Sequence, residues 1–128
     1  MDNPASQFII YTTELGDTRI DVRMEEETVW LSQKQMAELY QKDVRTVNEH
    51  IQNIYSEEEL LPEATIRNFR IVQQEGKRQV SRDIDHYNLD MILSVGYRIK
   101  SSIATRFRQW ATERLREYII KGKINVFV

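Results

Sequence analysis

Residues 32–56 read SQKQMAELYQKDVRTVNEHIQNIYS, and this stretch decides how the rest of the chain can be organised. Ser32 and Asp43 carry side chains that accept a hydrogen bond from a backbone N–H in the first turn of a helix, so each is a suitable N-cap. Apolar residues recur at helical spacing after each cap. The stretch therefore predicts two short amphipathic helices, at about 33–41 and 44–56.

The spacing of the two helices is typical of a helix-turn-helix. Ala37 is small, as needed where the second helix crosses the first closely. Because the turn has no glycine, Gln41 or Lys42 is expected to take any strained backbone conformation. The alternative is a plain helical hairpin within a core. In the first interpretation, the polar face of the second helix reads base edges in the major groove through Arg45, Thr46, Glu49, Gln52 and Asn53.

Residues 7–13 and 18–24, on the amino-terminal side, are runs rich in β-branched and aromatic residues. They predict a hairpin that turns near Gly16, and residues 28–31 can add a third strand.

A second hairpin is predicted at about 65–85, with its turn at Glu75-Gly76-Lys77. A basic hairpin after a helix-turn-helix is what a winged domain uses to hold DNA phosphates. A solvated edge strand whose charges discourage aggregation is the alternative. The candidate phosphate contacts on this hairpin are Arg67, Arg70, Lys77, Arg78 and Arg82.

Residues 88–122 predict the helical end of the domain. Asn88 can cap a helix that runs to about Val95 and stops at Gly96. Ser101 or Ser102 opens the longest helix, which is expected to reach about Lys121 with Gly122 as its C-cap. The two serines at this helix start can hold a phosphate, and the alternative is that they only cap the helix. Further candidate phosphate contacts here are Arg98, Lys100, Ser101, Ser102, Arg106 and Arg108.

The composition excludes several classes of site. The 128 residues suit one domain, expected to span 1–128, and with no Cys and two His they hold no thiolate nucleophile and no multi-histidine metal site. No run approaches the roughly 20 apolar residues of a membrane span, and the first residues do not resemble a signal peptide, so a cytoplasmic protein is expected.

The net charge of −2 conceals two oppositely charged halves. Residues 1–64 carry 5 basic and 14 acidic side chains, whereas residues 65–128 carry 13 basic and 6 acidic ones. The halves therefore have net charges of −9 and +7. Such asymmetry points to contact with nucleic acid or a membrane. It also allows an alternative function, a protein-interaction module in which the acidic half of one copy meets the basic half of another copy or of a partner.

The chain resembles the RhuM family of bacterial virulence-associated proteins, as the amino-terminal domain of longer members. The resemblance covers about residues 7–122 and implies a DNA-binding protein with no established enzymatic activity, often associated with mobile elements or pathogenicity islands. It does not supply DNA-contacting residues. The words that carry it are Val29-Trp30-Leu31, Gln35-Met36-Ala37-Glu38-Leu39-Tyr40, Glu75-Gly76-Lys77-Arg78, Tyr87-Asn88-Leu89-Asp90, Ser94-Val95-Gly96-Tyr97-Arg98, Ala104-Thr105-Arg106-Phe107-Arg108-Gln109-Trp110-Ala111 and Tyr118-Ile119-Ile120-Lys121-Gly122.

The sequence thus predicts an α+β fold: a winged helix-turn-helix-like domain with two β-hairpins and a long carboxy-terminal helix. The expected function is a DNA-binding regulator of transcription, not an enzyme, whose partner is double-stranded DNA. A homodimer is compatible with the sequence. No cofactor, metal or small-molecule substrate is expected.

Overall fold

The computed structural model describes residues 7–14 and 16–126. Within these ranges the elements are β1 (Gln7–Thr12), β2 (Arg19–Glu25), β3 (Thr28–Ser32), α1 (Gln33–Tyr40), α2 (Val44–Ser56), α3 (Pro62–Thr65), β4 (Ile66–Glu75), β5 (Arg78–Asn88), α4 (Leu89–Ile99) and α5 (Ser101–Val126). The predicted α+β fold with two hairpins and a long last helix is confirmed. The single-turn helix α3 was not predicted.

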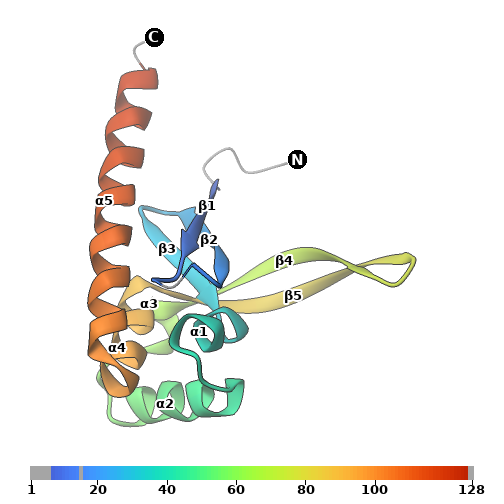
Figure 1. The fold of residues 1–128 in the computed structure, drawn as a ribbon, viewed down its shortest axis with the longest axis vertical. Helices are drawn as coiled ribbons and strands as arrows, with labels where there is room; N and C mark the ends of the chain where they lie inside the picture. The colour runs from blue at the N-terminus through green and yellow to red at the C-terminus, as the bar shows by residue number, and fades with distance from the viewer. Residues whose placement is uncertain (1–6, 15, 127–128) are drawn as a thin grey trace.

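The strands form one antiparallel sheet in the order β1-β2-β3-β5-β4. The first hairpin turns at Gly16 with a φ of 75°, and β3 is the expected third strand. Because β3 pairs with β5 only from Trp30 to Ser32, the outer parts of β4 and β5 have no strand beside them other than each other. They project from the body as a two-stranded arm, residues 68–85 (Figure 1).

One face of the sheet forms the core with the helices. Ile20, Val22 and Met24 alternate along β2 and are buried in one core cluster with side chains of α1, α2, α4 and α5. Phe107 of α5 is fully buried, and its ring lies edge-on to Tyr11 of β1 with 5.1 Å between the ring centroids. This packing joins the last helix to the first strand.

The predicted caps of α1 and α2 are confirmed. The Ser32 hydroxyl accepts from the Gln35 backbone N–H (3.2 Å), while Gln35 Oε1 accepts from the Ser32 backbone N–H (3.0 Å), which completes a capping box. Asp43 accepts from the Thr46 backbone N–H at 2.7 Å. Gln41 ends α1 in the left-handed conformation with a φ of 56°, as the glycine-free turn requires.

The two predicted glycine stops are wrong. α4 continues past Gly96 to Ile99. Gly96 does not end the helix but makes room within it, because a side chain there would run into the ring of Tyr40 and the methyl group of Ala104. Tyr40 Oη donates to the Ile92 backbone carbonyl at 2.7 Å, so α1 and α4 touch at this point. α5 likewise runs through Gly122 to Val126.

Candidate nucleic-acid interface

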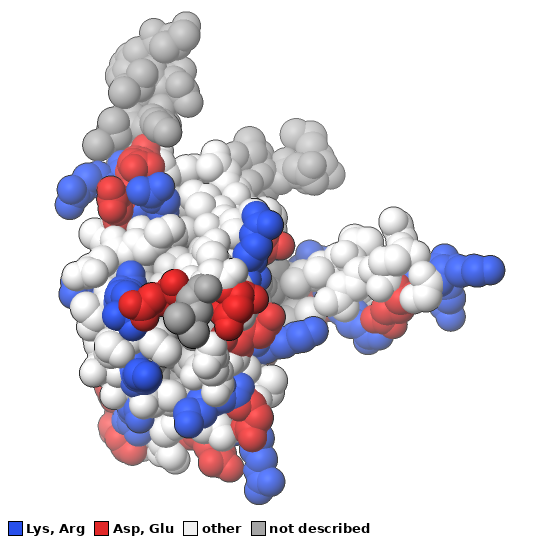
Figure 2. Space-filling view, viewed as in Figure 1, with Lys and Arg blue, Asp and Glu red and all other residues white. Residues whose placement is uncertain are grey.

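The arm carries unpaired cations at its tip. Glu75 pairs with Arg78 in the β-ladder, so the turn contains only Gly76 and Lys77, and Gly76 has the positive φ of 62° that such tight turns require. Lys77 and Arg78 are exposed, and neither forms an ion pair with another described residue. Figure 2 shows Lys and Arg side chains gathered at the end of the projecting arm. This end is therefore available to an anionic partner.

The other basic candidates of the hairpin are neutralised within the chain. Arg70 pairs with Asp83 across the arm at 3.1 Å, and Arg82 pairs with Glu75 at 2.8 Å. Arg67, at the base of the arm, pairs with Glu25 at 3.3 Å and also contacts Glu26. Of the five cations predicted to hold phosphates, the structure thus leaves two at the tip without a carboxylate partner.

The predicted base-reading residues all lie on α2, on the side opposite its buried Val47, Ile51 and Ile54. Arg45 and Glu49 are exposed and form an ion pair of 3.4 Å along the helix. Gln52 is one turn further along the same side. Thr46 and Asn53 flank Glu49 on the same broad face, because successive residues are rotated by about 100°. Asn48, at the edge of this face beside Gln52, joins α2 to α1 and, through Gln33, to the base of the arm.

Asn48 was not among the predicted residues. Its Oδ1 accepts from Gln33 Nε2 of α1 at 3.0 Å and from Gln52 Nε2 at 3.4 Å. The same Gln33 nitrogen donates to the hydroxyl of Tyr87 on β5 at 3.1 Å. These bonds connect α2, α1 and the base of the arm. The signal in the sequence was the spacing of Asn48 and Gln52, four residues apart on one side of a helix.

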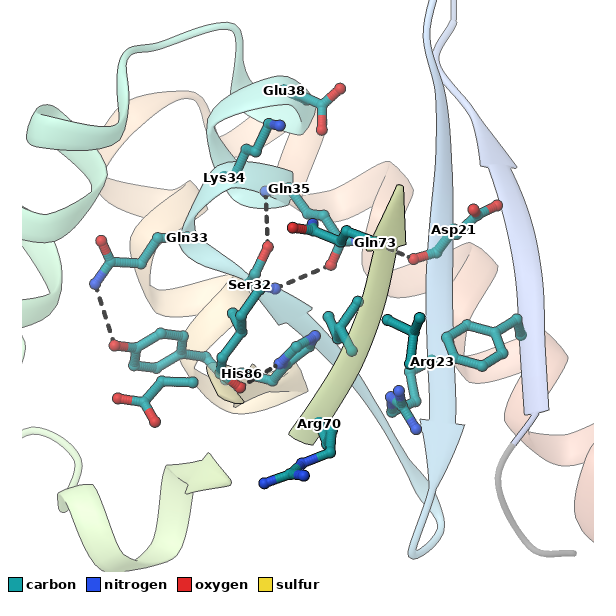
Figure 3. A pocket seen from close by; sticks show the side chains of 16 residues that line it. Asp21, Arg23, Ser32, Gln33, Lys34, Gln35, Glu38, Arg70, Gln73 and His86 are labelled. Atoms are coloured by element: carbon teal, nitrogen blue, oxygen red, sulfur yellow. Dashed lines mark hydrogen bonds between the residues drawn. The ribbon is translucent and has the colours of Figure 1, made fainter. Parts of the chain in front are cut away.

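A groove of about 740 Å³ lies between the first turn of α1, β2 and the base of the arm. Figure 3 shows Gln33, Lys34 and Gln35 on one side of it and Asp21 and Arg23 on the other. Gln35 Nε2 donates to the Asp21 backbone carbonyl at 2.7 Å and so engages one backbone acceptor of β2. The groove wall is therefore built largely of amide and charged side chains.

Aromatic contacts around Phe69 pack the base of the arm against the sheet. The guanidinium carbon of Arg23 lies 4.2 Å from the ring centroid of Phe69 on β4 and 4.6 Å from that of Phe8 on β1. The buried ring of His86 packs edge-on against Phe69 with 5.1 Å between centroids. Burial lowers the pKa of His86 below its ordinary value of 6.5, and the nearby Arg23 charge adds to the decrease. The arm therefore leaves the sheet from a packed base.

The predicted phosphate contacts of residues 98–108 lie elsewhere. α4 and the start of α5 are on the side of the molecule opposite the arm (Figure 1). Arg98 pairs with Glu57 and Glu59, and Arg106 pairs with Glu14. Lys100, Ser101, Ser102 and Arg108 are exposed. The structure does not bring this group together with the tip of the arm.

Two kinds of site are not found in the part of the chain that the structure describes. No three His, Asp or Glu side chains come together there as metal ligands. None of the helices in that part is long and apolar enough to pass through a bilayer.

A model of the virulence protein RhuM family matches residues 64–125. The matched segment contains the second half of α3, the whole hairpin, α4 and nearly all of α5. The resemblance stated from the sequence is confirmed over these residues, whereas its description as an amino-terminal domain is not, because the match falls on the carboxy-terminal part of the chain. No curated protein and no solved structure matches the chain.

Proposed function

Because residues 64–125 match the model of the virulence protein RhuM family, we propose that the chain is a virulence-associated regulator that binds double-stranded DNA without catalysing a reaction on it. In this proposal α1 and α2 act as a helix-turn-helix and the arm acts as its wing. α2 enters the major groove, and the tip of the arm contacts the phosphate backbone.

The observation that carries the proposal is the relation between α2 and the arm. Gln33 is bonded both to Asn48 in the first half of α2 and to Tyr87 at the base of the arm. The helix and the arm are thereby held at a defined distance from each other. The arm ends in the unpaired Lys77 and Arg78, which suit phosphate oxygens.

The same geometry limits the attraction to DNA. The hairpin cations with carboxylate partners contribute little net positive charge, so few counterions are released on binding. We therefore expect a shallow dependence on salt, with about two phosphate contacts at the tip of the arm.

The test is the affinity for a labelled duplex, measured by fluorescence anisotropy over a series of salt concentrations. Arg78→Ala should weaken binding to all sequences about equally and reduce the slope of log K against log salt by about one. Arg116→Ala removes the same charge from an exposed position on α5 and should change neither quantity. Failure to bind any duplex at low salt, or equal effects of the two variants, would overturn the proposal.

A further inference from the structure

The outer part of the arm has one face without charged side chains. In an antiparallel ladder, directly paired residues lie on the same face, and successive residues along a strand alternate between faces. Val72 pairs with Ser81, and Gln74 pairs with Gln79, so these four side chains share one face. All four are exposed. They lie between the cations at the tip and the ion pair that crosses the arm nearer its base, and we call them the neutral patch.

The neutral patch offers apolar and polar groups side by side. Val72 is 61% exposed, which leaves its methyl groups accessible. Gln74 donates to the Gly76 backbone carbonyl at 2.9 Å and is thus engaged within the turn. The side chains of Gln79 and Ser81 have no hydrogen-bond partner among the described residues. The patch therefore holds methyl groups near an amide and a hydroxyl that are available to a partner.

The opposite face of the same part of the arm has a different character. Arg82 and Glu75 form an ion pair of 2.8 Å there, and Val80 is half-buried. Gln73, which pairs with Val80, is exposed on this face. Gln73 and Gln79 are thus the same residue type on opposite faces of the arm, and they provide a matched comparison.

The groups of the neutral patch match the major-groove edge of an A·T pair. Thymine displays its methyl group there, and adenine displays an acceptor at N7 and a donor at N6. A glutamine amide has both a donor and an acceptor, so it can bond to both adenine atoms, and an apolar side chain fits the thymine methyl group. The major groove is also wide enough to admit a two-stranded β-ribbon.

We infer that the neutral patch selects an A·T pair in the major groove, with Gln79 on adenine and Val72 on the thymine methyl group. The inference rests on the proposed function and adds a second reading surface, at a position of the DNA site separate from the one that α2 reads. The cations at the tip supply the attraction to phosphates, since the uncharged patch adds none. Loss of the patch should therefore change base preference without changing the dependence of affinity on salt.

The experiment is a selection of bound duplexes from a random pool by the intact chain, followed by sequencing and by anisotropy with the selected duplex. The wild type should enrich A·T at one position, and Gln79→Ala should lose that preference, by roughly 5- to 100-fold in relative affinity. Gln73→Ala should keep it. Both variants should keep the wild-type slope of log K against log salt, because neither changes a charge. Thermal unfolding of each variant confirms that it is folded.

Deoxyuridine in place of the selected thymine tests the contact of Val72. This base lacks the methyl group that thymine places in the major groove. It should weaken binding by the wild type by about fourfold, which is the effect of one buried carbon group. Val72→Ala should bind the thymine and deoxyuridine duplexes equally.

The outcomes separate this inference from the proposed function. Duplex binding with no A·T preference that depends on Gln79 would overturn the inference alone. Equal losses of preference in Gln73→Ala and Gln79→Ala, or an equal effect of deoxyuridine on the wild type and Val72→Ala, would do the same. Absence of any selected duplex would overturn both.

Discussion

Arg98 at the end of α4 donates to Glu57 just beyond α2, with 2.8 Å between Nη2 and Oε1. The same nitrogen donates to Glu59 at 3.0 Å, and this bond lowers the pKa of the Glu59 carboxyl. Arg106 contacts Glu14 at 2.9 Å in the same manner. Each pair joins a carboxylate of the acidic half to a guanidinium of the basic half. The opposite charges of the two halves thus meet inside one copy.

This internal pairing leads to a prediction about self-association. If the halves of different copies were to pair, these ion pairs within one copy would first have to break. Exposed ion pairs contribute little free energy, so new pairs between copies would give little net stabilisation. We expect the mass measured by sedimentation to stay the same from low to high salt. Association that appears at low salt and disappears at high salt would favour the protein-interaction module over the proposed DNA-binding role.

Gly96→Ala should destabilise the chain, although alanine favours helices over glycine. The added methyl group would run into the Tyr40 ring and Ala104 in a fully packed region. Such overpacking costs about 1–3 kcal/mol. The free energy of unfolding, measured by urea titration, should fall by an amount in this range.

Tyr40→Phe provides the control for this contact. It removes the hydroxyl that lies nearest to the added methyl group, so the double variant with Gly96→Ala should lose less stability than the two single losses combined. Additive losses, or a more stable Gly96→Ala variant, would contradict the packing seen between α1 and α4.

The buried His86 should make the stability depend on pH. Its folded-state pKa is lowered, so it takes up a proton less readily in the folded chain than in the unfolded chain. Stability is then complete above the ordinary pKa of 6.5 and falls as the pH drops from there toward the folded-state pKa. The urea midpoint should therefore decrease as the pH falls from about 7 through the ordinary pKa of 6.5.

His86→Phe tests the origin of that decrease. Phenylalanine keeps a ring beside Phe69 but has no group that titrates, so the urea midpoint of this variant should change less over the same pH range. Parallel curves for the wild type and His86→Phe would assign the pH dependence to other groups.

Local features explain which parts of the fold could be predicted. The capping residues Ser32 and Asp43 and the turn glycines Gly16 and Gly76 act within a few residues of themselves, so the sequence near them contains the necessary information. Gly96 has the same appearance in sequence, but its role depends on Tyr40 in another helix. A stop signal and a packing requirement cannot be distinguished from the glycine alone.

The candidate interface was less predictable for the same reason. The pairing of Arg70 with Asp83 follows from the position of the two-residue turn and could have been derived. The partners of Arg98 and Arg106 come from elements distant in sequence, and no local pattern indicates them. The contact between Asn48 and the arm likewise depends on Gln33 and Tyr87, which lie in other elements.

Glu75→Gln should strengthen DNA binding, because the Glu75 carboxylate neutralises the positive charge of Arg82 on the arm. Arg82 donates from Nε and Nη2 to the two Glu75 oxygens, both at 2.9 Å, beside the exposed Lys77 and Arg78. Removal of the carboxylate charge leaves three uncompensated cations near the tip instead of two. The slope of log K against log salt should become steeper by about 0.9, with tighter binding at low salt.

Glu117→Gln makes the same charge change on α5, where Glu117 pairs with Arg114, and should leave the slope unchanged. If both variants tighten binding equally, net charge rather than the tip of the arm determines the affinity.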